Sequence, residues 1–268
     1  MDPDSRMTSA RRSLDGLSVG DAFGECFFLI AANPLSLELH LSTRELPNHR
    51  WRWTDDTAMA AAILEVLGRH GRIDQDDLAA TFARRCAWDD RRGYGGTAHG
   101  ILMAIGAGRH WSEVSPAVLS GMGSMGNGGA MRSAPLGAYF ANDTDELVAQ
   151  ARRSAEVTHA HPDGQAGAVA VALAAAFVAK HPTLPATEFR EPFFESVLRH
   201  SPDSQTRAGI AQARDLPATF AVETAASVLG NDSKLTAPDT VPPRSRQLHH
   251  RLSLQHRLSS LEVPGSDQ

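Results

Sequence analysis

The sequence feature that most constrains the fold is an apolar, alanine-rich run over residues 166–179. Nearly every face of a helix formed by this run is small and apolar, which is typical of a helix buried on all sides. The run is shorter than the about 20 residues that a helix needs to cross a bilayer. We therefore expect a central helix around which other helices pack, and no membrane partner.

The rest of the chain shows helical periodicity and no convincing alternating pattern of a strand. An apolar segment over residues 14–28 has glycines at every fourth position, which would let another helix approach closely along one face. The other predicted helices cover residues 55 to about 70, a stretch after the acidic turn at 74–77, a stretch around 101–105, and residues 143–157, 187–200, 203–214 and 220–229. The predicted fold class is all-α, a compact bundle of antiparallel helices.

Composition narrows the class of protein and its surroundings. Acidic residues number 31 and basic residues 26, for a net charge of −5, and this balance argues against a nucleic-acid partner, which a basic surface would serve. The two cysteines, Cys26 and Cys86, cannot form a disulfide framework, which favours a reducing, cytoplasmic setting. Residues 1–12 lack the apolar segment of a signal peptide.

The densest group of potential metal ligands is Thr54-Asp55-Asp56, directly before an apolar helical pattern. Adjacent carboxylates repel each other unless positive charge lies nearby, and a hard cation such as Mg²⁺ or Mn²⁺ binds carboxylate and hydroxyl oxygens. Thr and Asp are also the residues that cap helix N-termini without any metal. Both interpretations remain open at the level of the residues alone.

A second unusual stretch is rich in glycine, with five glycines and Asn127 between residues 121 and 132. Backbone without Cβ atoms can approach a ligand closely and turn its N–H groups toward a phosphate. The stretch has neither the Gly-Lys-Ser/Thr of a Walker loop nor the Gly-x-Gly-x-x-Gly of a dinucleotide site. A flexible linker is the alternative, but ordered mixed sequence resumes at Met131 and Arg132.

Four motifs taken together resemble the ADP-ribosylglycohydrolase family, the relatives of the enzyme that removes ADP-ribose from dinitrogenase reductase. They are Gly16-Leu-Ser-Val-Gly-Asp-Ala-Phe-Gly24, Trp53-Thr-Asp-Asp-Thr57, Gly126-Asn-Gly-Gly-Ala-Met-Arg132, and Thr158-His159 followed by Gly164-Gln-Ala-Gly167. The resemblance covers roughly residues 14–242. It implies an all-α fold and metal-dependent hydrolysis of the glycosidic bond between ADP-ribose and an acceptor, on an ADP-ribosylated protein or a small ADP-ribosyl substrate.

The resemblance also implies roles for individual residues. Thr54, Asp55 and Asp56 would bind Mg²⁺, with Mn²⁺ as the alternative ion, and Asp55 or Asp56 would position water. Glu25 would be a third catalytic acid, although similar sequences carry an acid where this chain has Phe28. The residues expected to contact the diphosphate, the ribose or the rest of the ligand are Gly126, Asn127, Gly128, Gly129, Met131 and His159.

The resemblance ends near Pro242, which predicts three parts: a polar leader over 1–13, a helical domain over 14–242, and a disordered tail over 243–268. Members of the family continue into a segment with paired aspartates that completes a two-metal centre. Asp239-Thr240 echoes it but precedes Val-Pro-Pro, so we expect a shortened enzyme with half of the metal centre. The alternatives are a degenerate ADP-ribose-binding protein, a non-functional fragment, and a metal-dependent phosphoester hydrolase.

Overall fold

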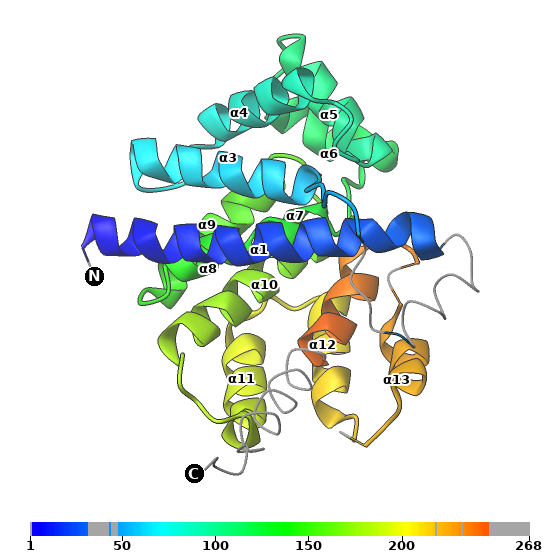
Figure 1. Ribbon diagram of the computed structural model, residues 1–268. Helices are drawn as coiled ribbons and strands as arrows, with labels where there is room; N and C mark the ends of the chain where they lie inside the picture. The colour runs from blue at the N-terminus through cyan, green and yellow to red at the C-terminus, as the bar shows by residue number, and fades with distance from the viewer. Residues whose placement is uncertain (1, 32–42, 44–47, 218, 232, 247–268) are drawn as a thin grey trace, which may run out of the picture.

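The protein is described by a computed structural model that covers residues 2–31, 43, 48–217, 219–231 and 233–246. Within these residues the regular structure is helical, apart from one isolated bridge between Gly126 and Thr236. The all-α prediction is confirmed (Figure 1). The helices are α1 Pro3–Ala31, α3 Asp55–His70, α4 Gln75–Trp88, α5 Gly96–Gly106, α6 Trp111–Gly121, α7 Gly128–Met131, α8 Ala134–Tyr139, α9 Thr144–Glu156, α10 Pro162–Lys180, α11 Ala186–His200, α12 Gln205–Asp215 and α13 Val222–Leu229.

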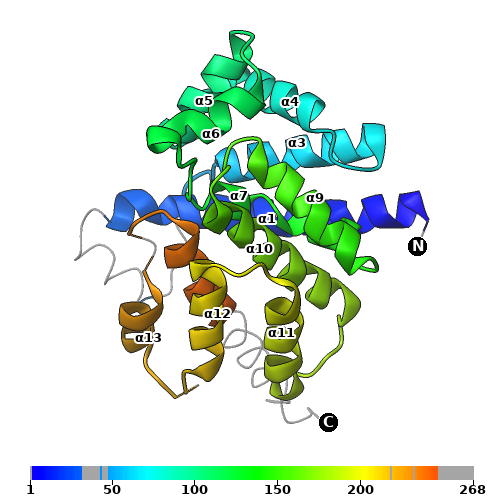
Figure 2. The same ribbon diagram turned by 180° about the vertical axis from the view of Figure 1, so that it is seen from behind.

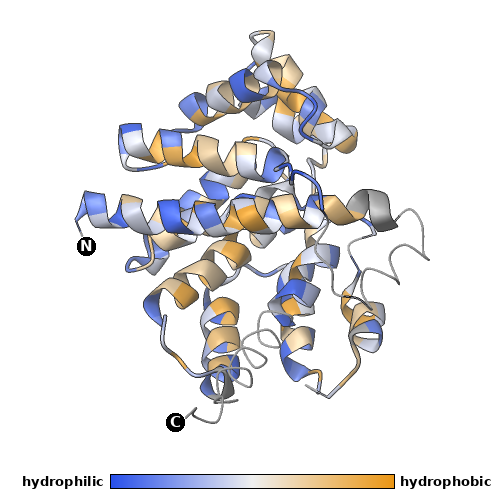
Figure 3. Cartoon of the chain, in the orientation of Figure 1, coloured by the Kyte–Doolittle hydropathy of each residue, from blue (hydrophilic) through white to orange (hydrophobic). Residues whose placement is uncertain are grey.

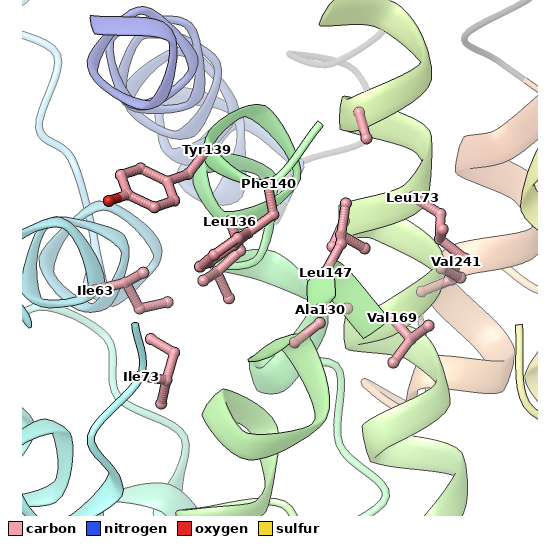
Figure 4. Packing of buried hydrophobic residues seen from close by; sticks show 14 of the residues in the cluster. Ile63, Ile73, Ala130, Leu136, Tyr139, Phe140, Leu147, Val169, Leu173 and Val241 are labelled. Carbon is pink, nitrogen blue, oxygen red and sulfur yellow. The ribbon is translucent and has the colours of Figure 1, made fainter. Parts of the chain in front are cut away.

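The predicted central helix is α10, which contacts α7, α8, α9, α11 and α12. By length and composition α10 is apolar enough to cross a membrane, but 61% of its most apolar window is buried inside the protein. Val169 and Leu173 of α10 pack in the same core as Leu136 of α8 and Leu147 of α9 (Figure 4). Its apolar surface is therefore used for packing between helices.

The N-terminal helix α1 begins at Pro3, so residues 3–13 of the predicted polar leader are helical and continue directly into the residues that follow. Ala10 is fully buried, and α1 packs against α3 and α8. Hydrophilic residues dominate the first half of α1, with one face left for packing (Figure 3). Among the described residues, the expected close approach at Gly16, Gly20 and Gly24 is not found, because a Cβ atom at any of them would meet none of their atoms within 4 Å.

The helices form tiers around α1 and α10. Helices α3 to α6 lie on one side and α11 to α13 on the other, while α7 and α9 lie behind α1 (Figures 1 and 2). After α5, Trp111 begins α6, where the His110 side chain accepts a hydrogen bond from the backbone N–H of Ser112.

Residues 237–246 are helical, so the boundary predicted at residue 242 lies inside a helical segment. Asp239 and Thr240 lie inside this helical segment, whereas the sequence was interpreted as placing them before non-helical chain. Residues 247–268 of the predicted tail lie outside the described residues, as does most of the loop expected over residues 33–52.

Candidate functional site

The predicted start of the acidic helix is confirmed, because α3 begins at Asp55 with Thr54 as its N-cap. The Thr54 hydroxyl oxygen accepts a hydrogen bond of 3.3 Å from the backbone N–H of Asp56. This is the capping geometry expected for Thr before a helix. Capping and cation binding are compatible, because a hydroxyl oxygen has two lone pairs.

Asp21 of α1 holds this helix start from across the helix interface. Its carboxylate accepts hydrogen bonds from the backbone N–H of Thr54 at 2.8 Å and from the Thr54 hydroxyl at 2.7 Å. It also accepts from the Thr57 hydroxyl and backbone N–H. Sequence reasoning selected Glu25 as the acid of this helix. The structure instead places Asp21 in contact with α3, while Glu25 is exposed one turn further along.

Asp55 is buried, and its environment carries more negative than positive charge. Burial raises the pKa of Asp55 to about 6; its backbone hydrogen bond lowers it, the charges of Asp21 and Glu25 raise it, and the Arg132 guanidinium lowers it. Its backbone N–H donates to the carbonyl oxygen of Arg92 at 2.7 Å, which ties α3 to the loop before α5. A cation placed here would relieve the carboxylate repulsion.

The donor set available to such a cation consists of hard oxygens. In the part of the chain that the structure describes, no three His, Cys, Asp or Glu side chains group as metal ligands. A site here would therefore combine the Thr54 hydroxyl with the Asp55 and Asp56 carboxylates and take its other ligands from water or substrate. That composition fits Mg²⁺, which usually keeps several waters and binds one or two protein carboxylates.

The glycine-rich stretch is an ordered turn attached to the chain near residue 236. The backbone N–H of Asn127 donates to Leu235 O, and Ala237 N–H donates to Met125 O. The Asn127 side-chain amide donates to the Thr240 hydroxyl at 3.2 Å. These contacts argue against a flexible linker. Asn127 and Thr240 therefore join the two segments, whatever else they contact.

His159 explains why glycine occupies two of these positions. A Cβ atom at Gly128 would lie 2.8 Å from His159 Cε1, and one at Gly126 would lie 3.2 Å from Nε2. Gly129 instead faces α9 and α10, where Ala155 and the carbonyl oxygen of Gly164 are close, and Met131 is partly buried against the core. The predicted association of the glycine stretch with His159 is thus a direct packing contact.

Arg132 is fully buried behind the glycine stretch. One terminal nitrogen donates to Gly128 O at 3.0 Å, and the other donates to Ser154 O at 2.8 Å and to the Thr158 hydroxyl oxygen at 2.9 Å. The guanidinium carbon lies 4.6 Å from the centre of the Phe82 ring. Burial lowers the pKa of Arg132 to about 9, and the negative charge of Asp55 opposes that shift.

These contacts bring most of the predicted site residues into one region. Arg132 interacts electrostatically with both Asp55 and His159 and is hydrogen-bonded to Gly128. Thr54 and Asp56 are joined to this region through α3. His161 caps α10 by accepting a hydrogen bond from the backbone N–H of Asp163.

A cavity of about 310 Å³ adjoins the start of α3, lined by Trp53, Ala58, Arg85, Trp88, Asp89, Asp90, Arg91 and Arg92. The Arg92 guanidinium stacks 3.5 Å from the centre of the Trp53 ring and donates to Trp53 O. The Trp53 side chain is partly exposed. Tyr94 lies partly buried against the core.

The chain is similar to a known family over nearly all of the described residues. The family model "ADP-ribosylglycohydrolase" matches residues 2–246. ADP-ribosylhydrolase ARH3 of Homo sapiens is 35% identical over 167 residues, or 61% of this chain and 44% of that protein. The Bos taurus ARH3 is 35% identical over 172 residues, with the same shares. An uncharacterized protein of Archaeoglobus fulgidus is 30% identical over 62% of this chain and 54% of its own length. The match thus spans less than half the length of the ARH3 relatives.

Proposed function

The chain belongs to the ADP-ribosylglycohydrolase family, and from this premise we propose that it cleaves the glycosidic bond between ADP-ribose and an acceptor. The acceptor belongs to an ADP-ribosylated protein or to a small ADP-ribosyl compound. Relatives named ADP-ribosylhydrolase support the reaction class. The observation that carries the proposal is the placement of Arg132, which bonds Gly128 and lies within electrostatic range of Asp55 and His159.

In this proposal the two parts of the site have separate tasks. The glycine stretch and His159 together hold the nucleotide, since the absence of side chains at Gly126 and Gly128 lets the His159 ring pack directly against this backbone. Asp55 and Asp56 orient a water molecule toward the anomeric carbon of the ribose, where positive charge develops as the bond breaks. Asp21 keeps the helix start in place by binding Thr54 and Thr57.

The proposed cofactor is Mg²⁺, with Mn²⁺ as the alternative, held by Thr54, Asp55 and Asp56. A bound divalent cation supplies orientation of the sugar hydroxyls and a lowered pKa of coordinated water. We propose one cation site within residues 2–246, corresponding to half of a two-metal centre. Isothermal titration with Mg²⁺ tests this part, and two sites of comparable affinity would contradict it.

The activity is tested by incubating the protein with an ADP-ribosylated protein, with Mg²⁺ or with a chelator, and identifying the product. We expect free ADP-ribose only with Mg²⁺, and loss of about 100-fold or more in Asp55→Asn and Asp56→Asn, the range for one preorganised electrostatic group. The matched control is Asp145→Asn, another acid in the first turn of a helix, α9. It should retain full activity.

The rival functions give different outcomes in the same assay. Release of AMP would indicate phosphoester cleavage and would contradict the proposal. Binding of ADP-ribose without any product, at an intact Mg²⁺ site, would indicate a binding protein in place of an enzyme. Equal loss in Asp145→Asn would show that the effect comes from the fold and not from the acids of α3.

A further inference from the structure

Thr158 lies between a cation and an imidazole, and all three groups are buried. Its hydroxyl oxygen accepts a hydrogen bond from Arg132 Nη2 at 2.9 Å. The same oxygen lies 2.8 Å from His159 Nδ1. The guanidinium can only donate, so the direction of the first hydrogen bond is fixed.

The direction of the second hydrogen bond follows from counting protons. A threonine hydroxyl has one hydrogen to donate, and Thr158 is fully buried. If His159 Nδ1 carried a proton and donated it, the hydroxyl oxygen would accept twice, and its own hydrogen would need a different acceptor. If the hydroxyl donates to Nδ1, then Arg132 Nη2, the Thr158 hydroxyl and His159 Nδ1 all have partners, which is the rule for buried polar groups.

We propose that Arg132 and Thr158 are positioning residues that hold His159 as the neutral tautomer with its proton on Nε2. Nε2 is the nitrogen that lies against Gly126 and Gly128, 3.2 and 3.0 Å from the places their Cβ atoms would take. His159 therefore presents a hydrogen-bond donor to the glycine stretch. This assignment rests on the proposed function. The group that His159 would bind is then an oxygen of the nucleotide sugar, either a phosphate oxygen or a ribose hydroxyl.

The electrostatics of the region agree with a neutral ring. Burial lowers the pKa of His159 to about 3, and the positive charge of Arg132 lowers it in the same direction. With Nδ1 occupied by Thr158 and Nε2 protonated, the ring has no free lone pair. His159 consequently does not act as a general base or bind a metal ion. Its contribution is to hold the substrate in one orientation.

The tautomer is measured directly in the whole protein by ¹⁵N-histidine NMR at neutral pH, without any ligand. Loss of the resonance in His159→Gln assigns it. We expect a proton on Nε2 in the wild type and in Thr158→Ser, which keeps the hydroxyl. In Thr158→Val, which has a similar shape and no hydroxyl, we expect a mixture of tautomers. Thr206→Val, at another fully buried threonine, is the control and should leave the His159 signal unchanged.

A proton on Nδ1 in the wild type would overturn the proposal, and so would an unchanged Nε2 proton in a folded Thr158→Val. If Thr158→Val does not fold, the wild-type and Thr158→Ser spectra still decide the tautomer. Titration with ADP-ribose then tests the donor role: we expect the Nε2 proton to shift on binding, and Thr158→Val to bind about tenfold more weakly, the size of one hydrogen bond. Binding without such a shift contradicts the donor role. Absence of binding contradicts the proposed function and leaves the tautomer result intact.

Discussion

Two neighbouring regions of the site surround a buried charged side chain with different groups. At the start of α3, Asp55 is surrounded by other acids, and its pKa is raised to about 6 by burial, with Asp21 and Glu25 adding to the shift. At the end of α7, Arg132 is fully buried, and its terminal nitrogens donate to Gly128 O, Ser154 O and Thr158. Burial disfavours both charges, but the Asp55 carboxylate also faces other acids, whereas the Arg132 guanidinium has hydrogen-bond acceptors supplied by the protein.

This difference distinguishes the start of α3, which could bind a cation, from the Arg132 network, which holds the surrounding structure in place. A charge whose partners all belong to the protein fixes geometry, because removing one partner leaves buried groups unpaired. Acids that repel each other favour a cation from solution. Substitutions in the two regions should therefore have opposite effects on stability, and this contrast can be broken or sharpened by measurement.

The largest expected effect comes from Arg132→Met, which removes the hydrogen-bond donors and keeps an unbranched, apolar side chain. Gly128 O, Ser154 O and the Thr158 oxygen then lose their partner, and we expect a loss of about 3–5 kcal/mol in the free energy of unfolding. Urea denaturation measures it. The control is Arg84→Met, an exposed arginine paired with Glu65, where we expect a loss of less than about 1 kcal/mol. Similar losses in both variants would contradict a supporting role for the buried network.

The next effect is smaller and tests the packing of His159 on the glycine stretch. Gly128→Ala places a Cβ atom 2.8 Å from His159 Cε1, and we expect a destabilisation of about 1–3 kcal/mol from overpacking. Gly20→Ala on α1 is the matched control, because no atom in the part of the chain that the structure describes lies within 4 Å of its Cβ position. That substitution should stabilise by about 0.5–1 kcal/mol, since Ala is the better helix former. A stabilising Gly128→Ala would show that His159 moves aside freely.

The sequence predicted correctly those helices whose ends and buried faces are determined by residues close together in the chain. Thr54 and Asp74 cap α3 and α4 as their residue types predict, and the small apolar faces of residues 166–179 identified the central helix. The short helices α7 and α8 and the helix at Trp111 escaped prediction. Glycines, Pro116 and Pro135 weaken the helical signal there, and α7 and α8 form against α10.

The spacing of residues along one helix could not show which of them would contact a neighbouring helix. Asp21 and Glu25 are four residues apart in the sequence, yet only Asp21 binds α3, because the crossing point of α1 and α3 decides which acid reaches it. The same spacing in Gly16, Gly20 and Gly24 predicts a shared face and says nothing about whether that face is covered. Arg132 adjoins the glycine motif in sequence, but its contacts with Ser154 and Thr158 depend on the placement of α9.

A third prediction concerns how the free energy of unfolding depends on pH through the titration of His159. Its pKa is about 3 in the folded protein and about 6.5 in the unfolded chain, so the unfolded state binds the proton first as the pH falls. The stability that depends on neutral His159 is fully present above pH 6.5 and is lost as the pH falls toward 3. Between pH 6.5 and 5 we expect the wild type to lose about 1–2 kcal/mol more than His159→Gln. Parallel pH profiles for the two proteins, from urea denaturation, would contradict the burial of a neutral ring.

The smallest expected effect returns to the acids of α3 and has the opposite sign. In metal-free buffer near pH 8, Asp55→Asn removes a buried charge that Asp21 and Glu25 repel, and we expect a gain of about 1 kcal/mol in the free energy of unfolding, as when a strained functional group is removed. Added Mg²⁺ should then raise the melting temperature of the wild type and leave that of Asp55→Asn unchanged, because only a bound ligand stabilises by mass action. A loss of stability in Asp55→Asn would mean that the Asp55 carboxylate is a structural group like Arg132, and the contrast between the two regions would fail.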